Sequence, residues 1–105
     1  MRLFQGIVLA GHSNENEALF SARLSRFWTG ILRGYPEQFE AVYAESSEFG
    51  STDNRPTRQY AVEPAVVLFL EEKLKEAGIV LLPVDPDDTY TRHEAVAPDW
   101  WQIEH

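Results

Sequence analysis

Apolar positions change from a continuous run to a helical period within the first twenty residues. The run Leu3–Ala10 is almost wholly apolar and rich in strand-forming residues, and Gly11 follows it. Because eight residues suit a strand better than a helix, the run predicts a β-strand buried on both faces. From Glu17 onward, apolar residues recur at steps of three or four, which predicts an α-helix that closes at Gly34-Tyr35-Pro36. The apolar face comprises Phe20, Leu24, Phe27, Trp28, Ile31 and Tyr35, flanked by Leu19 and Leu32.

The second half of the chain shows a similar alternation. Arg58–Val62 is short and typical of a strand, and Pro64 then suits the first position of a helix that ends before Gly78. That helix is expected to bury Val66, Val67, Leu70, Leu74 and Ala77. The apolar run Ile79–Val84 predicts a further strand, whose far end Pro83 restricts to an edge or terminus.

Two segments between the helices are less regular. Residues 45–57 are dense in Gly, Pro, Asn, Asp and Ser, which predicts a loop. Glu45, Glu48 and Asp53 lie in or beside it, so it is either a binding loop or the connection of a β-hairpin. Phe39–Ala44 fits a strand or a short helix, and its partial alternation favours the strand.

The order strand, helix, strand, strand, helix, strand predicts an α+β fold. It is the βαββαβ pattern of a ferredoxin-like two-layer sandwich, with an antiparallel sheet and both helices on one face. The first strand is then central and the last lies at an edge. If residues 39–44 were helical instead, a three-layer or parallel arrangement would be the alternative. We expect residues 1–84 to form this domain and residues 85–105 an acidic extension that packs on the domain or on a partner.

Composition narrows the class of protein. The 105 residues are 44% apolar and 12% aromatic, which is typical of one globular domain. No cysteine is present, so disulfides and thiolate metal sites are excluded. The apolar start of the chain is too short for a signal sequence or a membrane span, so we expect a soluble cytoplasmic protein.

The net charge of −8 is unevenly placed. Residues 1–44 carry four acids and four bases, whereas residues 45–105 carry thirteen acids and five bases. This excess is expected to repel nucleic acid and to attract a basic partner surface, although acids also serve simply to keep a small protein soluble.

The stretch GHSNENE, residues 11–17, offers a candidate chemical site. His12 and Ser13 would lie between a central strand and a helix N-terminus, where free amides favour an anion and a His can exchange protons. No nucleophile elbow or P-loop can be read here, because the run has one glycine and no lysine. A helix cap by Ser13, Asn14 or Asn16 is therefore the favoured interpretation.

Three further groups are candidate binding residues. Arg26 and Arg33 share one helix face near Arg23 and could hold an anion or simply be solvated. Asp85, Asp87 and Asp88, with His93, lack the spacing of a calcium loop, so a turn is expected and neither a metal nor a cofactor is predicted. The adjacent Trp100 and Trp101 are expected to dock, as an interface anchor or over the edge strand.

Two functions follow. The first is a small acidic interaction module of the inhibitor, immunity or adaptor type, which binds a basic partner protein through Asp85, Asp87, Asp88 and the Trp100-Trp101 pair. The second is an anionic-ligand-binding domain or modest enzyme, with His12 as acid or base and Arg26 or Arg58 holding the anion. A homodimer is possible in either case.

Overall fold

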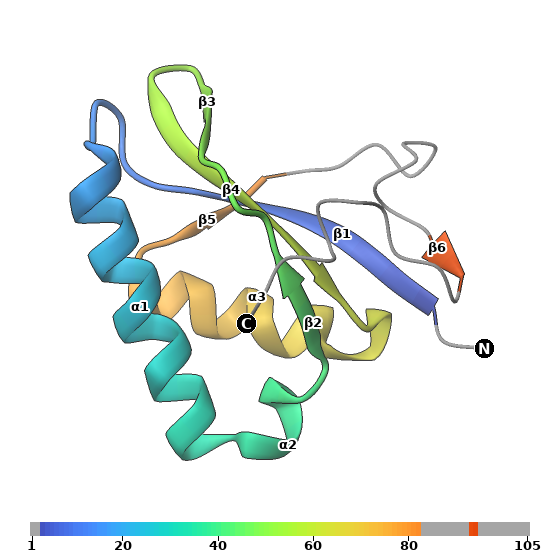
Figure 1. Cartoon of the computed structure of the whole chain (residues 1–105). Coiled ribbons are helices and arrows are strands. Elements are labelled where there is room, and N and C mark those ends of the chain that lie inside the picture. The colour runs from blue at the N-terminus through green and yellow to red at the C-terminus, as the bar shows by residue number, and fades with distance from the viewer. Residues whose placement is uncertain (1–2, 83–92, 95–105) are drawn as a thin grey trace.

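The computed structural model describes residues 3–82 and 93–94, and it shows an α+β fold built on an antiparallel sheet (Figure 1). The elements are β1 (Leu3–Ala10), α1 (Glu17–Gly34), α2 (Pro36–Phe39), β2 (Val42–Glu45), β3 (Gly50–Thr52), β4 (Arg55–Val62), a 3₁₀ turn (Pro64–Val66), α3 (Val67–Ala77), β5 (Val80–Leu81) and β6 (His93–Glu94).

Strand β1 lies in the middle of the sheet, as its apolar sequence predicts. The strand order is β2-β4-β1-β5, with β3 also paired to β4 and β6 paired to the start of β1. The long pairing joins β1 and β4, from Gln5 opposite Val62 to Ala10 opposite Thr57. Strand β5 pairs with the far end of β1, at Leu9 and Ala10. Strand β2 therefore lies at the edge of the sheet.

Helices α1 and α3 pack on the same face of this sheet. Alternate residues of a strand point to one face, and Ile7 and Leu9 of β1 share a buried cluster with Tyr60 and Val62 of β4. The helices add their buried stripes to this cluster, namely Phe20, Leu24, Phe27 and Ile31 from α1 and Leu70 and Leu74 from α3. The helical periods in the sequence therefore identified the core, although Leu19, Leu32, Tyr35 and Ala77 are exposed.

Both predicted helices have the ends that their sequences favour. Of the three candidate caps, Asn16 is the one that caps the N-terminus of α1. Its side-chain oxygen accepts a hydrogen bond from the Leu19 amide at 2.8 Å. Pro64 opens the 3₁₀ turn that leads into α3, and Gly78 ends α3 with a left-handed φ of 72°. A side chain at Gly78 would be strained in that conformation.

The predicted loop at residues 45–57 is instead mostly a hairpin. Strand β3 and the first residues of β4 pair within it, with Gly50 opposite Thr57 and Thr52 opposite Arg55. The two turn residues, Asp53 and Asn54, have φ of 51° and 64°, and a two-residue hairpin turn requires such values. Of the two interpretations of residues 45–57, the hairpin is the one that the structure supports, although its strands extend further into the segment than expected, up to a turn in which Asp-Asn replaces the usual glycine.

Phe39–Ala44 divides between the two alternatives. Phe39 ends the short helix α2, whereas Val42–Ala44 belongs to β2. The pairing of β2 with β4 shifts register between Val42 and Ala44, which marks a β-bulge.

Several expectations lie outside the described residues. They concern the strand beyond Leu82, the three aspartates Asp85, Asp87 and Asp88, and the pair Trp100-Trp101. In the part of the chain that is described, no helix is long and apolar enough to cross a membrane.

The packing of α1 on the sheet generates a stability prediction. Leu24 is 2% exposed in the core, so Leu24→Ala is expected to lower the free energy of unfolding by about 2–5 kcal/mol. Leu68 is 77% exposed on α3, and Leu68→Ala should change that free energy by less than about 0.5 kcal/mol. Urea denaturation of both variants gives the comparison, and equal costs would contradict the assigned core.

Candidate functional site

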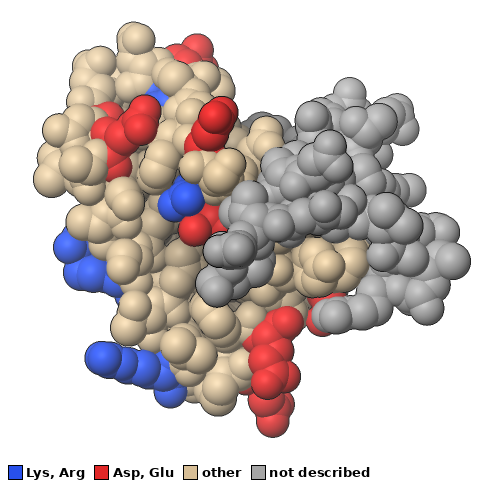
Figure 2. Space-filling model, in the orientation of Figure 1, with Lys and Arg blue, Asp and Glu red and all other residues tan. Residues whose placement is uncertain are grey.

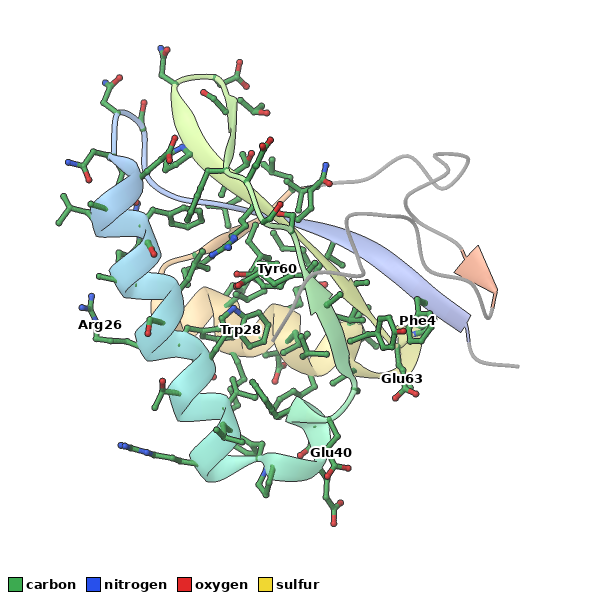
Figure 3. The ribbon with its side chains drawn as sticks, viewed as in Figure 1. Phe4, Arg26, Trp28, Glu40, Tyr60 and Glu63 are labelled. Carbon is green, nitrogen blue, oxygen red and sulfur yellow. The ribbon has the colours of Figure 1, made fainter. Side chains whose placement is uncertain are left out.

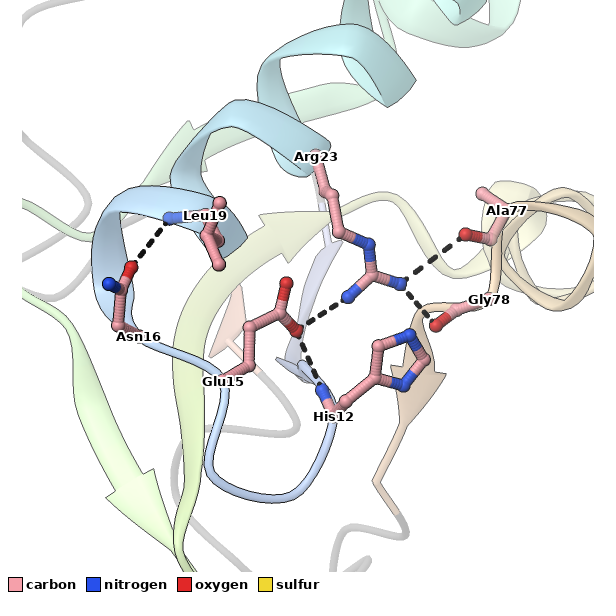
Figure 4. A network of polar contacts seen from close by, with 7 residues as sticks. All are labelled: His12, Glu15, Asn16, Leu19, Arg23, Ala77 and Gly78. Carbon is pink, nitrogen blue, oxygen red and sulfur yellow. Dashed lines mark hydrogen bonds and ion pairs between the residues drawn. The ribbon is translucent and has the colours of Figure 1, made fainter.

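The stretch after β1 forms a polar network that joins the start of α1 to the end of α3 (Figure 4). The Glu15 Oε1 atom accepts hydrogen bonds from the His12 amide at 2.7 Å and from Arg23 Nη1 at 2.6 Å. Arg23 Nη2 donates to the carbonyl oxygens of Gly78 at 2.5 Å and Ala77 at 3.4 Å. One guanidinium thus pairs with a loop carboxylate and satisfies the carbonyl end of another helix.

Gly11 is required by the close packing of this loop. Its amide donates to the Pro56 carbonyl at 2.9 Å. A Cβ atom placed on Gly11 would overlap the Glu15 carboxylate and lie 3.0 Å from Phe20 and Pro56 side-chain atoms. The loop can therefore fold tightly against β4 only when this position lacks a side chain.

His12 and Ser13 lie at the outside of the network. Both residues are exposed, and the bond from His12 uses its backbone amide. Among the residues that the structure describes, neither side chain has a hydrogen-bond partner, so no nucleophile and base are paired here. Nor do three His, Asp or Glu side chains come together as a metal site anywhere in residues 3–82 and 93–94. The arrangement supports the interpretation of this stretch as a helix cap, provided by Asn16, and as a structural connection between the two helices.

The Glu15–Arg23 pair is expected to contribute to stability. The two side chains are 7% and 16% exposed, so Glu15→Ala leaves a mostly buried cation without its partner. We expect this to lower the free energy of unfolding by about 1–3 kcal/mol. His12→Ala keeps the amide donor and should change it by less than about 0.5 kcal/mol. Thermal and urea unfolding of both variants would check this, and a large effect of His12→Ala would contradict it.

A hollow of about 270 Å³ opens between α1 and the edge strand β2. Its α1 wall combines hydroxyl groups with apolar side chains, and its sheet wall carries a carboxylate and a guanidinium. The lining residues are Ser21, Leu24, Ser25, Trp28, Thr29, Leu32, Phe39, Glu45 and Arg58. A second hollow of similar volume lies between β4 and residues 46–50, and Arg58 belongs to the walls of both.

The carboxylate of Glu45 is held from two sides. The Tyr60 hydroxyl donates a 2.6 Å hydrogen bond to Oε2, and Arg58 Nη2 lies 3.3 Å from Oε1. Arg58 is itself fixed, because its Nε donates to the Ser46 carbonyl at 2.9 Å and its guanidinium lies 4.6 Å from the centre of the Phe49 ring. Glu45 remains 33% exposed, so the hollow presents an oriented carboxylate to solvent.

Trp28 lies against Tyr60 between α1 and the sheet (Figure 3). Their ring centres are 5.1 Å apart. The Trp28 indole N–H is buried and forms no hydrogen bond with the described residues, although its proximity acts to lower the pKa of Tyr60. Burial and the Glu45 carboxylate prevail, and they raise the pKa of Tyr60 well above its ordinary value.

Because Tyr60 is protonated in the folded state, the free energy of unfolding depends on pH in the alkaline range. Because its pKa is higher in the folded state, its contribution is complete below about pH 10 and is lost as the pH rises further. Above about pH 10, the free energy of unfolding should fall faster in the wild type than in Tyr60→Phe, by up to about 1.4 kcal/mol per pH unit. Urea denaturation across this range measures both slopes, and parallel curves would contradict the buried phenol.

The arginines of α1 do not converge on one point. Arg23 is engaged in the Glu15 network, whereas Arg26 and Arg33 are exposed. Figure 3 shows Arg26 directed away from the sheet. No described residue forms an ion pair with Arg26 or Arg33, so both are available on the outer side of α1.

A group of acids lies at the sheet edge, and the sequence placed Glu45 and Glu48 in a candidate binding loop but did not join Glu40 to them. Glu40, Glu45 and Glu48 lie on or beside β2, and we call β2 with these three residues the acidic edge. The sequence signal is a stretch without bases, since residues 34–54 contain five acids and no lysine or arginine. The strand order places this stretch at the end of the sheet as far as the described residues go.

No protein-family model matches the chain, and comparison with curated proteins and with solved structures gave no match either.

Proposed function

We propose that this protein is a small acidic interaction module, of the inhibitor, immunity or adaptor type, which binds a basic surface of a partner protein through the acidic edge. The observation that supports it is the position of the acids. Among the described residues, β2 pairs with β4 and ends the strand order, and Glu40, Glu45 and Glu48 lie on or beside it in a stretch of sequence without a base, with Arg58 of β4 paired to Glu45.

The distribution of charge over the molecule favours the same surface. In Figure 2, blue side chains project from the left margin, where α1 lies in Figure 1, red side chains lie on the upper and lower parts of the described surface, and smaller blue areas lie beside the upper red ones. Arg26 and Arg33 belong to α1, on a different element from the acidic edge. The three acids would attract a basic partner to the edge, where Arg58 is already paired with Glu45.

We also propose that the fold is ferredoxin-like. If β2 and β3 are taken as one interrupted strand, the order β2-β4-β1-β5 places the second, third, first and fourth strands side by side. That order and the two helices on one face support the assignment. The assignment carries no function, because such folds host many unrelated activities.

The acidic segment and the tryptophan pair extend this proposal. Asp85, Asp87 and Asp88 would add negative charge for the same basic partner, and Trp100 and Trp101 would supply an apolar anchor. The net charge of −8 disfavours direct binding of nucleic acid. A cytoplasmic setting remains a prediction of the sequence.

Binding of an anionic ligand at His12 has less support. Arg58 already contacts Glu45 and the Ser46 carbonyl, and Arg23 is engaged by Glu15. The exposed His12 and Ser13 would have to act without either cation.

Charge reversal at the acidic edge tests the proposed function. The tagged Glu40→Lys/Glu48→Lys variant is expected to retain at least about tenfold less of any salt-sensitive partner from native extract than the wild type. The matched control is Glu71→Lys/Glu72→Lys, which makes the same change of charge on exposed positions of α3. Quantitative mass spectrometry after washes of rising salt compares the three proteins. Equal losses in both variants, or no loss in either, would contradict an interface at the acidic edge.

A further inference from the structure

We propose that the hollow between α1 and β2 is a binding site for a small neutral molecule that carries a primary carboxamide on a planar ring. The amide group pairs with Glu45 and Arg58 together, and the ring lies against the apolar part of the wall. This site goes beyond the interaction module, which requires only the charge of the acidic edge.

The size and the lining of the hollow suit a ligand of this kind. Ligand pockets combine an apolar lining with a few polar groups, and their volumes begin at about 300 Å³. The hollow, with about 270 Å³, is at the small end of this range, which favours a single-ring ligand. Trp28 and Phe39 meet edge to face in its wall, with ring centres 6.4 Å apart. A planar ligand ring can extend this group of aromatic contacts.

Charge determines which class of ligand fits the hollow. Glu45 and Arg58 are the charged residues among the described ones that line it. Arg58 Nη2 lies 3.3 Å from Glu45 Oε1, so the two charges act from nearly the same place. A cation attracted by Glu45 is repelled by Arg58, and an anion attracted by Arg58 is repelled by Glu45. A neutral group with a donor and an acceptor side by side avoids both repulsions.

Both members of the ion pair retain hydrogen-bonding capacity. A carboxylate accepts about four hydrogen bonds, and Tyr60 and Arg58 each contact one oxygen of Glu45. In Arg58, the described residues accept from Nε and pair with Nη2, but they make no hydrogen bond with Nη1. A primary carboxamide can therefore donate to Glu45 and accept from Arg58 while the existing contacts stay in place.

The ion pair is held in position before any ligand arrives. The Tyr60 hydroxyl orients Glu45, whereas the Ser46 carbonyl and the Phe49 ring orient Arg58. Little side-chain freedom is therefore lost on binding. An ordinary surface ion pair lacks this order, because two long side chains must be immobilised to form it.

The wall of the hollow also contains a polar group without a partner. The Trp28 indole N–H is buried and forms no hydrogen bond with the described residues. Buried donors normally have an acceptor, and a carboxamide oxygen is an acceptor of the kind that this N–H lacks. The indole N–H is therefore a suitable reporter of binding.

Three isosteric probes test the ligand class on the full chain. Benzamide, benzoate and benzamidine share one ring and nearly one shape, but they are neutral, anionic and cationic. Chemical shifts of the β2 amides and of the Trp28 indole N–H should show saturable binding of benzamide. Benzoate and benzamidine should bind at least about tenfold more weakly, because each meets a like charge at Glu45 or Arg58. No saturable shift with benzamide, or any other order of these affinities, overturns the proposal.

Acetamide separates a free ring ligand from a protein side chain as the source of the amide. It has the amide group of an asparagine side chain and no ring, so it should bind at least about tenfold more weakly than benzamide. Equal binding of the two amides would contradict the role given to the aromatic wall.

Two variants test the position of the ligand and the role of the ion pair. Ser25→Tyr places a bulky side chain in the hollow and should weaken benzamide binding at least about tenfold. Ala22→Tyr is the matched control, because Ala22 is exposed on α1 outside the described lining, and it should leave binding unchanged. Glu45→Gln keeps the shape but removes the charge, so it should raise the affinity for benzoate relative to benzamide at least about tenfold. Equal changes for both ligands would contradict recognition by the ion pair.

The test of this site is separate from the test of the proposed function. Partner capture is measured with Glu40→Lys/Glu48→Lys, and neither residue belongs to the described lining of the hollow. Benzamide binding together with partner capture that is indifferent to charge reversal would refute the interaction module alone. Charge-dependent capture without benzamide binding would refute the carboxamide site alone.

Discussion

Strand β1 must satisfy its backbone on both sides while side chains bury both of its faces, and the positions of the other elements follow from this constraint. Buried N–H and C=O groups require partners, and β4 supplies them along one side of β1, whereas β5 and β6 pair with the two ends of its other side. On one face of β1, the side chains of Ile7 and Leu9 point toward the helices and join the main core. Phe4 packs instead with Ala44 and Ala61 in a small separate cluster. With β4 fixed beside β1, the chain preceding β4 can pair only on the outside, and this places β2 at the edge.

The core and the exposed edge are connected through one side chain. The Tyr60 ring is buried with Ile7 and Leu9, yet its hydroxyl reaches Glu45 at the edge strand. Packing of the ring therefore sets the position of the oxygen that Glu45 contacts, and Arg58 fixes the carboxylate from the other side. By contrast, the Glu15–Arg23 pair is turned inward and joins secondary structures. The two ion pairs thus have different consequences, since only the first presents an oriented charge to solvent.

Local patterns in the sequence predicted the elements more completely than their contacts. The helical periods located Phe20, Leu24, Leu70 and Leu74 in the core. Gly78 correctly marked the end of α3, because the preference of a helix end for glycine depends only on the neighbouring sequence. The hairpin was one of two interpretations of residues 45–57, but its turn at Asp53-Asn54 was not located, because left-handed turns are most readily recognised by glycine. Nothing near Glu15 in the sequence indicates that Arg23 would bridge it to Gly78, since that contact depends on how α3 returns to the sheet. Glu45 and Glu48 were placed in a candidate binding loop, but their position with Glu40 beside one strand was not predicted, because it depends on the strand order.

The pairing of β1 with β4 also dictates the order in which a nascent chain can fold. Gln5 finds its partner only when Val62 has been synthesised, so the most apolar strand leaves the ribosome long before its neighbour. Contacts of such large sequence separation form slowly, because a long loop must close before they contribute. Helix α1, which is complete before β4 begins, carries Phe20, Leu24 and Phe27 on the stripe that later covers Ile7 and Leu9. An early, non-specific association of that stripe with β1 would shield the strand from aggregation during synthesis.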